Sequence, residues 1–265
     1  IRRTGHGLSE EHRWDVYWDA PLNHPEEVKR SAAQFHAQSI QVRREGLRTQ
    51  VVFPGVTLGS FSGSLQCTVY EGSNLLRVEV IAKTDEPSVA YKYAGGLRGF
   101  APRRIVWRDV QDQPQDLVPG GEAENVPIPL RARSRLLVLE TANGCVACFP
   151  PPHTFFFPRQ LEINLGFVWY RRAGNSVAVG VRHGDTHEGY NSTFIEKVFP
   201  LYNAPPGTWQ RMAAYFYLSA GSAELCRAEA LTYTHGDRYQ PLPGYRTMAC
   251  HFHTAFHTGF RDWIA

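Results

Sequence analysis

The stretch "LLRVEVIAK" at residues 75–83 decides the fold class. Successive side chains of a β-strand point to opposite faces of its sheet. Leu76, Val78 and Val80 therefore lie on one face of this stretch. Arg77, Glu79 and Lys83 lie on the other face, which also carries the apolar Ile81. The run "SLQCTVY" (64–70) and the turn "EGSN" (71–74) precede it, so the sequence predicts an antiparallel hairpin with one buried face.

Further β signals follow along the chain. Asn143-Gly144 separates two short β runs, and Asn-Gly is the strongest short signal for a hairpin turn. Another hairpin is expected within residues 165–184, turning at 173–175, and an alternating strand over 209–219. This density of strands and turns predicts a mainly β fold, an antiparallel two-sheet β-sandwich.

Two segments of the chain have signals that are typical of a helix. Residues 25–35 begin with proline and two glutamates, and residues 222–233 offer Ser222 as a cap with Glu224 behind it. We expect one or two short helices. We also expect three regions along the chain: an irregular N-terminal segment packing on the sandwich (1–46), the sandwich (47–235), and a linker with the start of a second, α/β domain (236–265).

Composition limits the classes of partner. The chain has 265 residues, of which 43% are hydrophobic and 12% aromatic, so a sizeable core can form. The net charge is only +3 and the Arg-Arg pairs are spread out, which argues against a nucleic-acid partner. The sequence contains no apolar run of about 18 residues, which is the length that predicts a membrane span. The twelve tyrosines and six tryptophans suit a homo-oligomer interface as well as a sugar groove.

The five cysteines do not predict a redox or zinc site. Their number is odd and their spacing wide, which is not typical of a disulfide framework. Cys145 and Cys148 form a C-x-x-C pair after the Asn143-Gly144 turn, where a strand is expected. Positions i and i+3 of a strand point to opposite faces, so these thiols are expected to be separate buried side chains.

The histidine cluster near residue 265 is the first candidate site. In a strand, His251 and His253 would share one face, about 7 Å apart along the backbone, and two such imidazoles can chelate a divalent ion such as zinc, manganese or iron. His257 would join only if the chain turns back. A metal needs three or four ligands, so the site is expected to be incomplete here. The alternative is an exposed histidine-rich tail.

Four stretches carry a resemblance to a known group: "TVYEGSNLLRVEVIAKTDEPSVAYKYAGGLRGF", "FFFPRQLEINLGFVWYRR", "LYNAPPGTWQRMAAYFYLS" and "PLPGYRTMACHFH". They resemble bacterial proteins in which a β-rich N-terminal region precedes a PHP-like (polymerase and histidinol phosphatase) metal-dependent hydrolase domain. The resemblance implies that His251 and His253 are the H-x-H metal ligands of the first barrel strand. It also implies a phosphoesterase-type hydrolase, exported from the cell, whose remaining barrel is truncated here; no signal peptide is present.

A second candidate site lies on and beyond the 165–184 hairpin. It combines aromatic, basic and histidine side chains: Trp169, Arg171, Arg182, His183, His187 and Tyr190. Arginine can hold a sugar carboxylate while an aromatic ring stacks on the sugar, and histidine with tyrosine can move a proton beside a carboxylate. A polar connecting loop explains the same residues without a ligand.

Three functions therefore remain open. The chain is the accessory β region of a metal-dependent hydrolase, or a β-sandwich that binds carbohydrate or another cell-surface ligand without catalysis. The third is a lyase-like or epimerase-like enzyme acting on acidic sugars, with catalytic candidates Arg171, His183, His187 and Tyr190.

Overall fold

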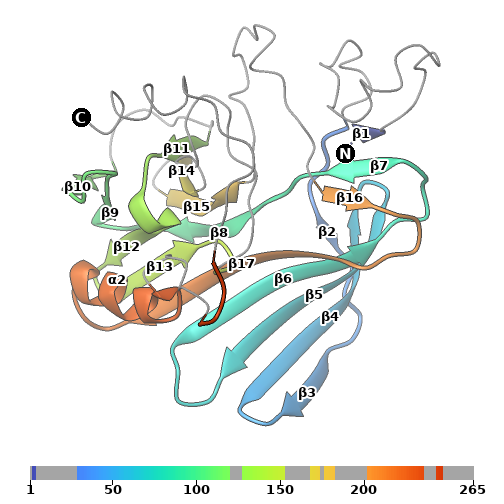
Figure 1. Ribbon diagram of the computed structural model, residues 1–265, viewed down its shortest axis with the longest axis horizontal. Helices are drawn as coiled ribbons and strands as arrows, with labels where there is room; N and C mark the ends of the chain where they lie inside the picture. The colour runs from blue at the N-terminus through green and yellow to red at the C-terminus, as the bar shows by residue number, and fades with distance from the viewer. Residues whose placement is uncertain are drawn as a thin grey trace, which may run out of the picture.

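The computed structural model describes residues 2–3, 29–119, 127–152, 168–173, 176–182, 202–235 and 243–246. The chain is mainly β in these residues, with antiparallel sheets and one α-helix (Figure 1). The predicted fold class, a mainly β antiparallel sandwich with a short helix, is confirmed.

The largest sheet has ten strands, and β3 lies outside its linear order because it pairs with β4. The neighbouring strands are, in spatial order, β10 (Pro114–Leu117), β9 (Arg104–Arg108), β12 (Leu137–Thr141), β13 (Gly144–Phe149), β17 (Gln210–Ser219), β6 (Leu75–Lys83), β5 (Phe61–Tyr70), β4 (Arg48–Leu58) and β2 (Gln34–Phe35), with β3 (Gln41–Glu45) beside β4.

Two smaller sheets complete the fold. The four-stranded sheet consists of β11 (Ile128–Leu130), β14 (Val168–Ala173), β15 (Ser176–Arg182) and β8 (Ala94–Phe100). The three-stranded sheet consists of β1 (Arg2–Arg3), β7 (Val89–Tyr91) and β16 (Tyr202–Ala204). A short 3-10 turn, η3 (Arg133–Arg135), leads into β12.

The main core lies between the ten-stranded and four-stranded sheets. Alternate residues of β12, β13 and β17 face the inner residues of β14 and β15, including Leu137, Cys148, Phe216, Val168 and Val179. A second inner cluster joins β5, β6 and β17 to the three-stranded sheet through side chains such as Phe61, Met212 and Tyr91. The face of the large sheet that points away from these cores is called the outer face below.

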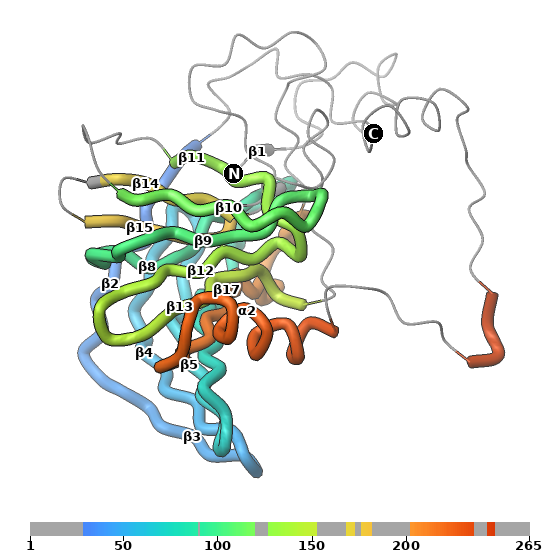
Figure 2. Tube along the Cα trace, turned by 90° about the vertical axis from the view of Figure 1, so that its left-hand side faces the viewer, coloured from blue at the N-terminus to red at the C-terminus, as the bar shows by residue number. Residues whose placement is uncertain are grey.

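Helix α2 (Ala223–Thr232) covers one half of the outer face. Ser222 caps it by accepting a hydrogen bond from the Leu225 amide, as predicted. Its buried side of Ala223, Cys226 and Ala230 packs on outer-face residues of β13 and β17. In Figure 1 and Figure 2, β12 and β13 lie between α2 on one side and β14 and β15 on the other. Helix, large sheet and small sheet therefore form three successive layers.

The predicted hairpins are confirmed. The helix expected over residues 25–35 is wrong for residues 29–35, the part of it that the structure describes. The pairs β5–β6, β12–β13 and β14–β15 are antiparallel hairpins. Residues 29–33, within the helix expected over 25–35, have no regular structure, and Gln34–Phe35 form β2 because they pair with β4. Strands β2 and β3 also precede residue 47, so the large sheet begins before the expected start of the sandwich region.

The C-x-x-C prediction is also confirmed. Cys145 packs on the outer side of β13 beneath α2, whereas Cys148 belongs to the inner core. Both thiols are free and buried, and burial raises the pKa of Cys148 above its usual value. A thiol that stays protonated is a poor nucleophile and metal ligand, so these cysteines serve packing.

Candidate ligand-binding face

The half of the outer face that α2 leaves uncovered carries a polar cluster. Its members come from three neighbouring strands and lie on the outer side of each, and we call them the polar face: Gln66 and Thr68 of β5, Arg77 and Glu79 of β6, and Arg211 of β17. The register explains how they meet, because Gln66 is directly opposite Glu79 and Thr68 is opposite Arg77. Arg211 lies diagonally from Glu79, within reach of a long side chain.

Glu79 is the centre of the polar face, and its side chain is fully buried. Arg77 Nη2 donates to one carboxylate oxygen at 2.6 Å, and Arg211 Nη1 contacts both oxygens at 2.9 and 3.1 Å. Gln66 Nε2 adds a hydrogen bond at 3.2 Å and also reaches Thr68 Oγ1. A buried carboxylate is tolerated only when it is paired and hydrogen-bonded, and Glu79 meets both conditions.

Aromatic rings border the cluster on the side toward α2. The Arg77 guanidinium lies over the Tyr215 ring, 5.7 Å from its centroid, and Phe149 stacks beside Tyr215 at 5.8 Å. Burial raises the pKa of Tyr215, and Arg77 opposes part of this rise, so its hydroxyl stays protonated at neutral pH. Tyr215 and Tyr70 are both half-buried.

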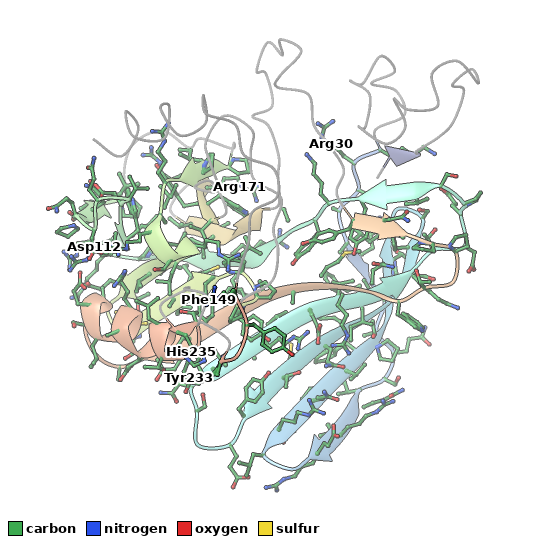
Figure 3. The ribbon with its side chains drawn as sticks, in the orientation of Figure 1. Arg30, Asp112, Phe149, Arg171, Tyr233 and His235 are labelled. Atoms are coloured by element: carbon green, nitrogen blue, oxygen red, sulfur yellow. The ribbon has the colours of Figure 1, made fainter. Side chains whose placement is uncertain are left out.

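The predicted residues Trp169 and Arg171 lie elsewhere, on β14 of the four-stranded sheet. Their neighbours Val168 and Tyr170 face the core, so alternation directs Trp169 and Arg171 away from it, on the opposite side of the sandwich from the polar face. Figure 3 shows Arg171 at the small sheet and Phe149 beside α2. Trp169 is only 9% exposed, and Gly180 makes room for its ring, since a Cβ there would lie 2.8 Å from Cζ2.

The other predicted site residues lie outside what the structure describes. Arg182 ends β15, but its side chain is not among the described ones, nor are His183, His187, Tyr190, His251, His253 and His257. A lyase-like role for the first group and a metal-binding role for the second therefore stay predictions. Within the described ranges, no group of three histidine, cysteine or acidic side chains has the arrangement of a metal site.

Sequence reasoning missed the polar face. Arg77-x-Glu79 on one side of a strand is a visible signal, because residues two apart share a face. The alternation predicts the solvated side of a half-buried strand here, yet Glu79 has no exposed side-chain surface. Arg211, which completes the cluster, comes 132 residues later, and no local pattern links it to Glu79.

Comparisons with known proteins identify no family for the chain. No family model matches the chain, and no curated protein matches it. A solved structure described as a galactose mutarotase related enzyme from Lactobacillus acidophilus is similar to the chain with a TM-score of 0.37 and 11% sequence identity, covering 70% of this chain and 72% of that one. No helix in the described part of the chain has the length and hydropathy needed to cross a bilayer.

Proposed function

We propose that the chain binds carbohydrate on the polar face. The observation that carries this proposal is the pair of arginines, Arg77 and Arg211, that the buried Glu79 holds beside half-buried aromatic residues, on a half of the sheet that α2 does not cover. Sugar rings offer hydroxyl groups for hydrogen bonds and C–H faces for aromatic contact. A small number of well-placed polar groups beside aromatic side chains is typical of ligand sites.

The side chains of the polar face are held in place before any ligand arrives. Arg77 and Arg211 are both anchored on Glu79, and Gln66 is anchored on Glu79 and Thr68. Anchored side chains lose little conformational freedom on binding, which favours affinity. Arg211 remains 53% exposed, so its remaining N–H groups can reach a ligand.

A glycan-binding experiment tests this function. The protein is screened against immobilised neutral and acidic glycans, and each ligand found is measured by calorimetry. Arg211→Gln is expected to weaken binding about tenfold or more, because it removes a charged donor. The matched control is Arg44→Gln, since Arg44 is an exposed arginine that also pairs with a glutamate but points to the other side of the sheet. Equal losses in the two variants, or no binding by the native protein, would refute the proposal.

A second proposal rests on the His251-x-His253 motif: the intact protein is an exported, PHP-like metal-dependent hydrolase to which this β region belongs. The spacing is that of two imidazoles on one face of a strand, which suits zinc, manganese or iron. A hydrolase would require further ligands from a following domain, so only partial metal occupancy is expected here.

Elemental analysis of the purified protein tests the metal proposal. We expect less than one equivalent of metal per chain, and less again in the double variant His251→Ala/His253→Ala. Replacing His235 with alanine provides the control, since it is a histidine outside the motif. Metal content that does not change in the double variant would rule out this site.

A further inference from the structure

We infer that the polar face prefers a sugar bearing a carboxylate over the same sugar without the charge. The inference rests on the proposed carbohydrate binding and adds the charge class of the ligand. It follows from the charges that the sheet register brings to the uncovered half of the outer face.

The register places an excess of basic side chains on this half. Residues opposite one another in antiparallel strands share a face, so Arg43, Thr68 and Arg77 lie in one row across β3 to β6. Taken together, β3, β4, β5, β6 and β17 present five cationic side chains on this side and two acidic ones: Arg43, Arg48, Arg77, Lys83 and Arg211 against Glu45 and Glu79.

The two acidic side chains are already neutralised. Glu45 forms an ion pair with Arg48. Glu79 is shared by Arg77 and Arg211 and has no exposed surface, so it offers little repulsion to an incoming anion. One of these two guanidinium charges therefore remains uncompensated beside the rings of Tyr215 and Tyr70. A positively charged surface of this kind attracts anions and raises their local concentration.

The arginine geometry suits a carboxylate in particular. Arg211 contacts Glu79 through Nη1 alone, and its half-exposed side chain keeps Nε and Nη2 for a second partner. Arginine binds carboxylates through two parallel N–H groups, an arrangement that a neutral ester or hydroxyl cannot match.

The test compares two forms of one glycan that differ only in charge. Oligogalacturonate and its methyl ester are titrated into the protein at low and high salt by calorimetry. We expect the acid to bind about tenfold more tightly at low salt, and the difference to shrink as salt screens the charges. Arg211→Gln should weaken binding of the acid more than binding of the ester, and so remove most of the preference. Arg44→Gln should keep the preference for the acid, because Arg44 lies on the other side of β3.

The outcomes distinguish failure of the charge preference from failure of carbohydrate binding. If both forms bind the native protein with equal affinity, the charge preference is wrong and carbohydrate binding stands. If no glycan binds, neutral or acidic, carbohydrate binding is wrong and the preference fails with it. If Arg44→Gln reduces acid binding as much as Arg211→Gln, the attraction is general and is not a property of the polar face. A cooperative urea unfolding transition shows that the Arg211→Gln variant is folded.

Discussion

The two halves of the outer face differ although the same strands build them. Strands β6 and β17 begin or end in the half beneath α2, where Leu75 and Tyr217 pack on the helix, and continue into the uncovered half, where Glu79 and Arg211 form an ion pair. Strand alternation decides only which residues face outward. Whether an outward position is apolar depends on the element that covers it, and that element comes from another part of the chain.

The largest effect is expected in the covered half, from Phe149→Ala. Phe149 is 1% exposed and lies between the sheet and α2, so truncation leaves a cavity that the surrounding residues cannot close fully. The free energy of unfolding should fall by about 3 to 5 kcal/mol, measured by urea denaturation. Phe35→Ala is the control because Phe35 is 56% exposed, and its loss should stay within about 0.5 kcal/mol. Similar losses for the two variants would show that α2 does not seal this half.

The next effect is expected in the uncovered half, from Glu79→Gln. The substitution keeps the shape but leaves two guanidinium groups without their shared counter-charge. Breaking a buried ion pair costs about 3 to 5 kcal/mol, and the partial exposure of both arginines should reduce this to about 2 kcal/mol. The triple variant Arg77→Met/Glu79→Leu/Arg211→Met should recover much of the stability, since apolar replacement of a buried ion pair is often neutral.

Recovery of stability without recovery of ligand binding would show that the ions of the polar face serve function more than folding. A triple variant far less stable than Glu79→Gln would show that the charged cluster mainly stabilises the fold. Glycan binding by the folded triple variant would likewise contradict the proposed function.

A smaller effect is expected at the start of α2, the helix that covers one half of the outer face. Ser222→Ala removes the hydroxyl that accepts a hydrogen bond from the Leu225 amide at 3.3 Å. Loss of such a cap costs about 1 kcal/mol. Hydrogen exchange should rise at the first turn of α2 and remain unchanged in β5 and β6. Faster exchange throughout the sheet would mean that the helix supports both halves.

The local parts of the fold were predictable from the sequence. The alternation in residues 75–83 identifies the buried face of β6, and Asn143-Gly144 identifies the β12–β13 turn, because both signals lie within a few residues. Ser222 similarly marks the start of α2. These features depend on backbone geometry that neighbouring residues determine.

The candidate site was not predictable in the same way. The burial of Glu79 depends on Arg211 from β17, and only the strand order brings these two side chains together. Within the described part of residues 25–35, the expected helix is absent for a related reason, since pairing of Gln34 and Phe35 with β4 overrides their local preference. Trp169 and Arg171 lie on one arm of the predicted hairpin, as expected. That hairpin belongs to the four-stranded sheet, whereas the polar face lies on the ten-stranded sheet.

The smallest effect should come from an ion pair that matches the one at Glu79 in distance but not in burial. Arg44 and Glu71 lie 2.7 Å apart, against 2.6 Å for Arg77 and Glu79, yet both partners of the first pair are more than half exposed. Water and salt screen such a pair, so Arg44→Gln should cost at most about 0.5 kcal/mol. A double-mutant cycle on each pair isolates its coupling energy, and raising the salt concentration should reduce only the exposed coupling. Equal couplings would mean that distance, rather than the burial of Glu79, determines the strength of these pairs.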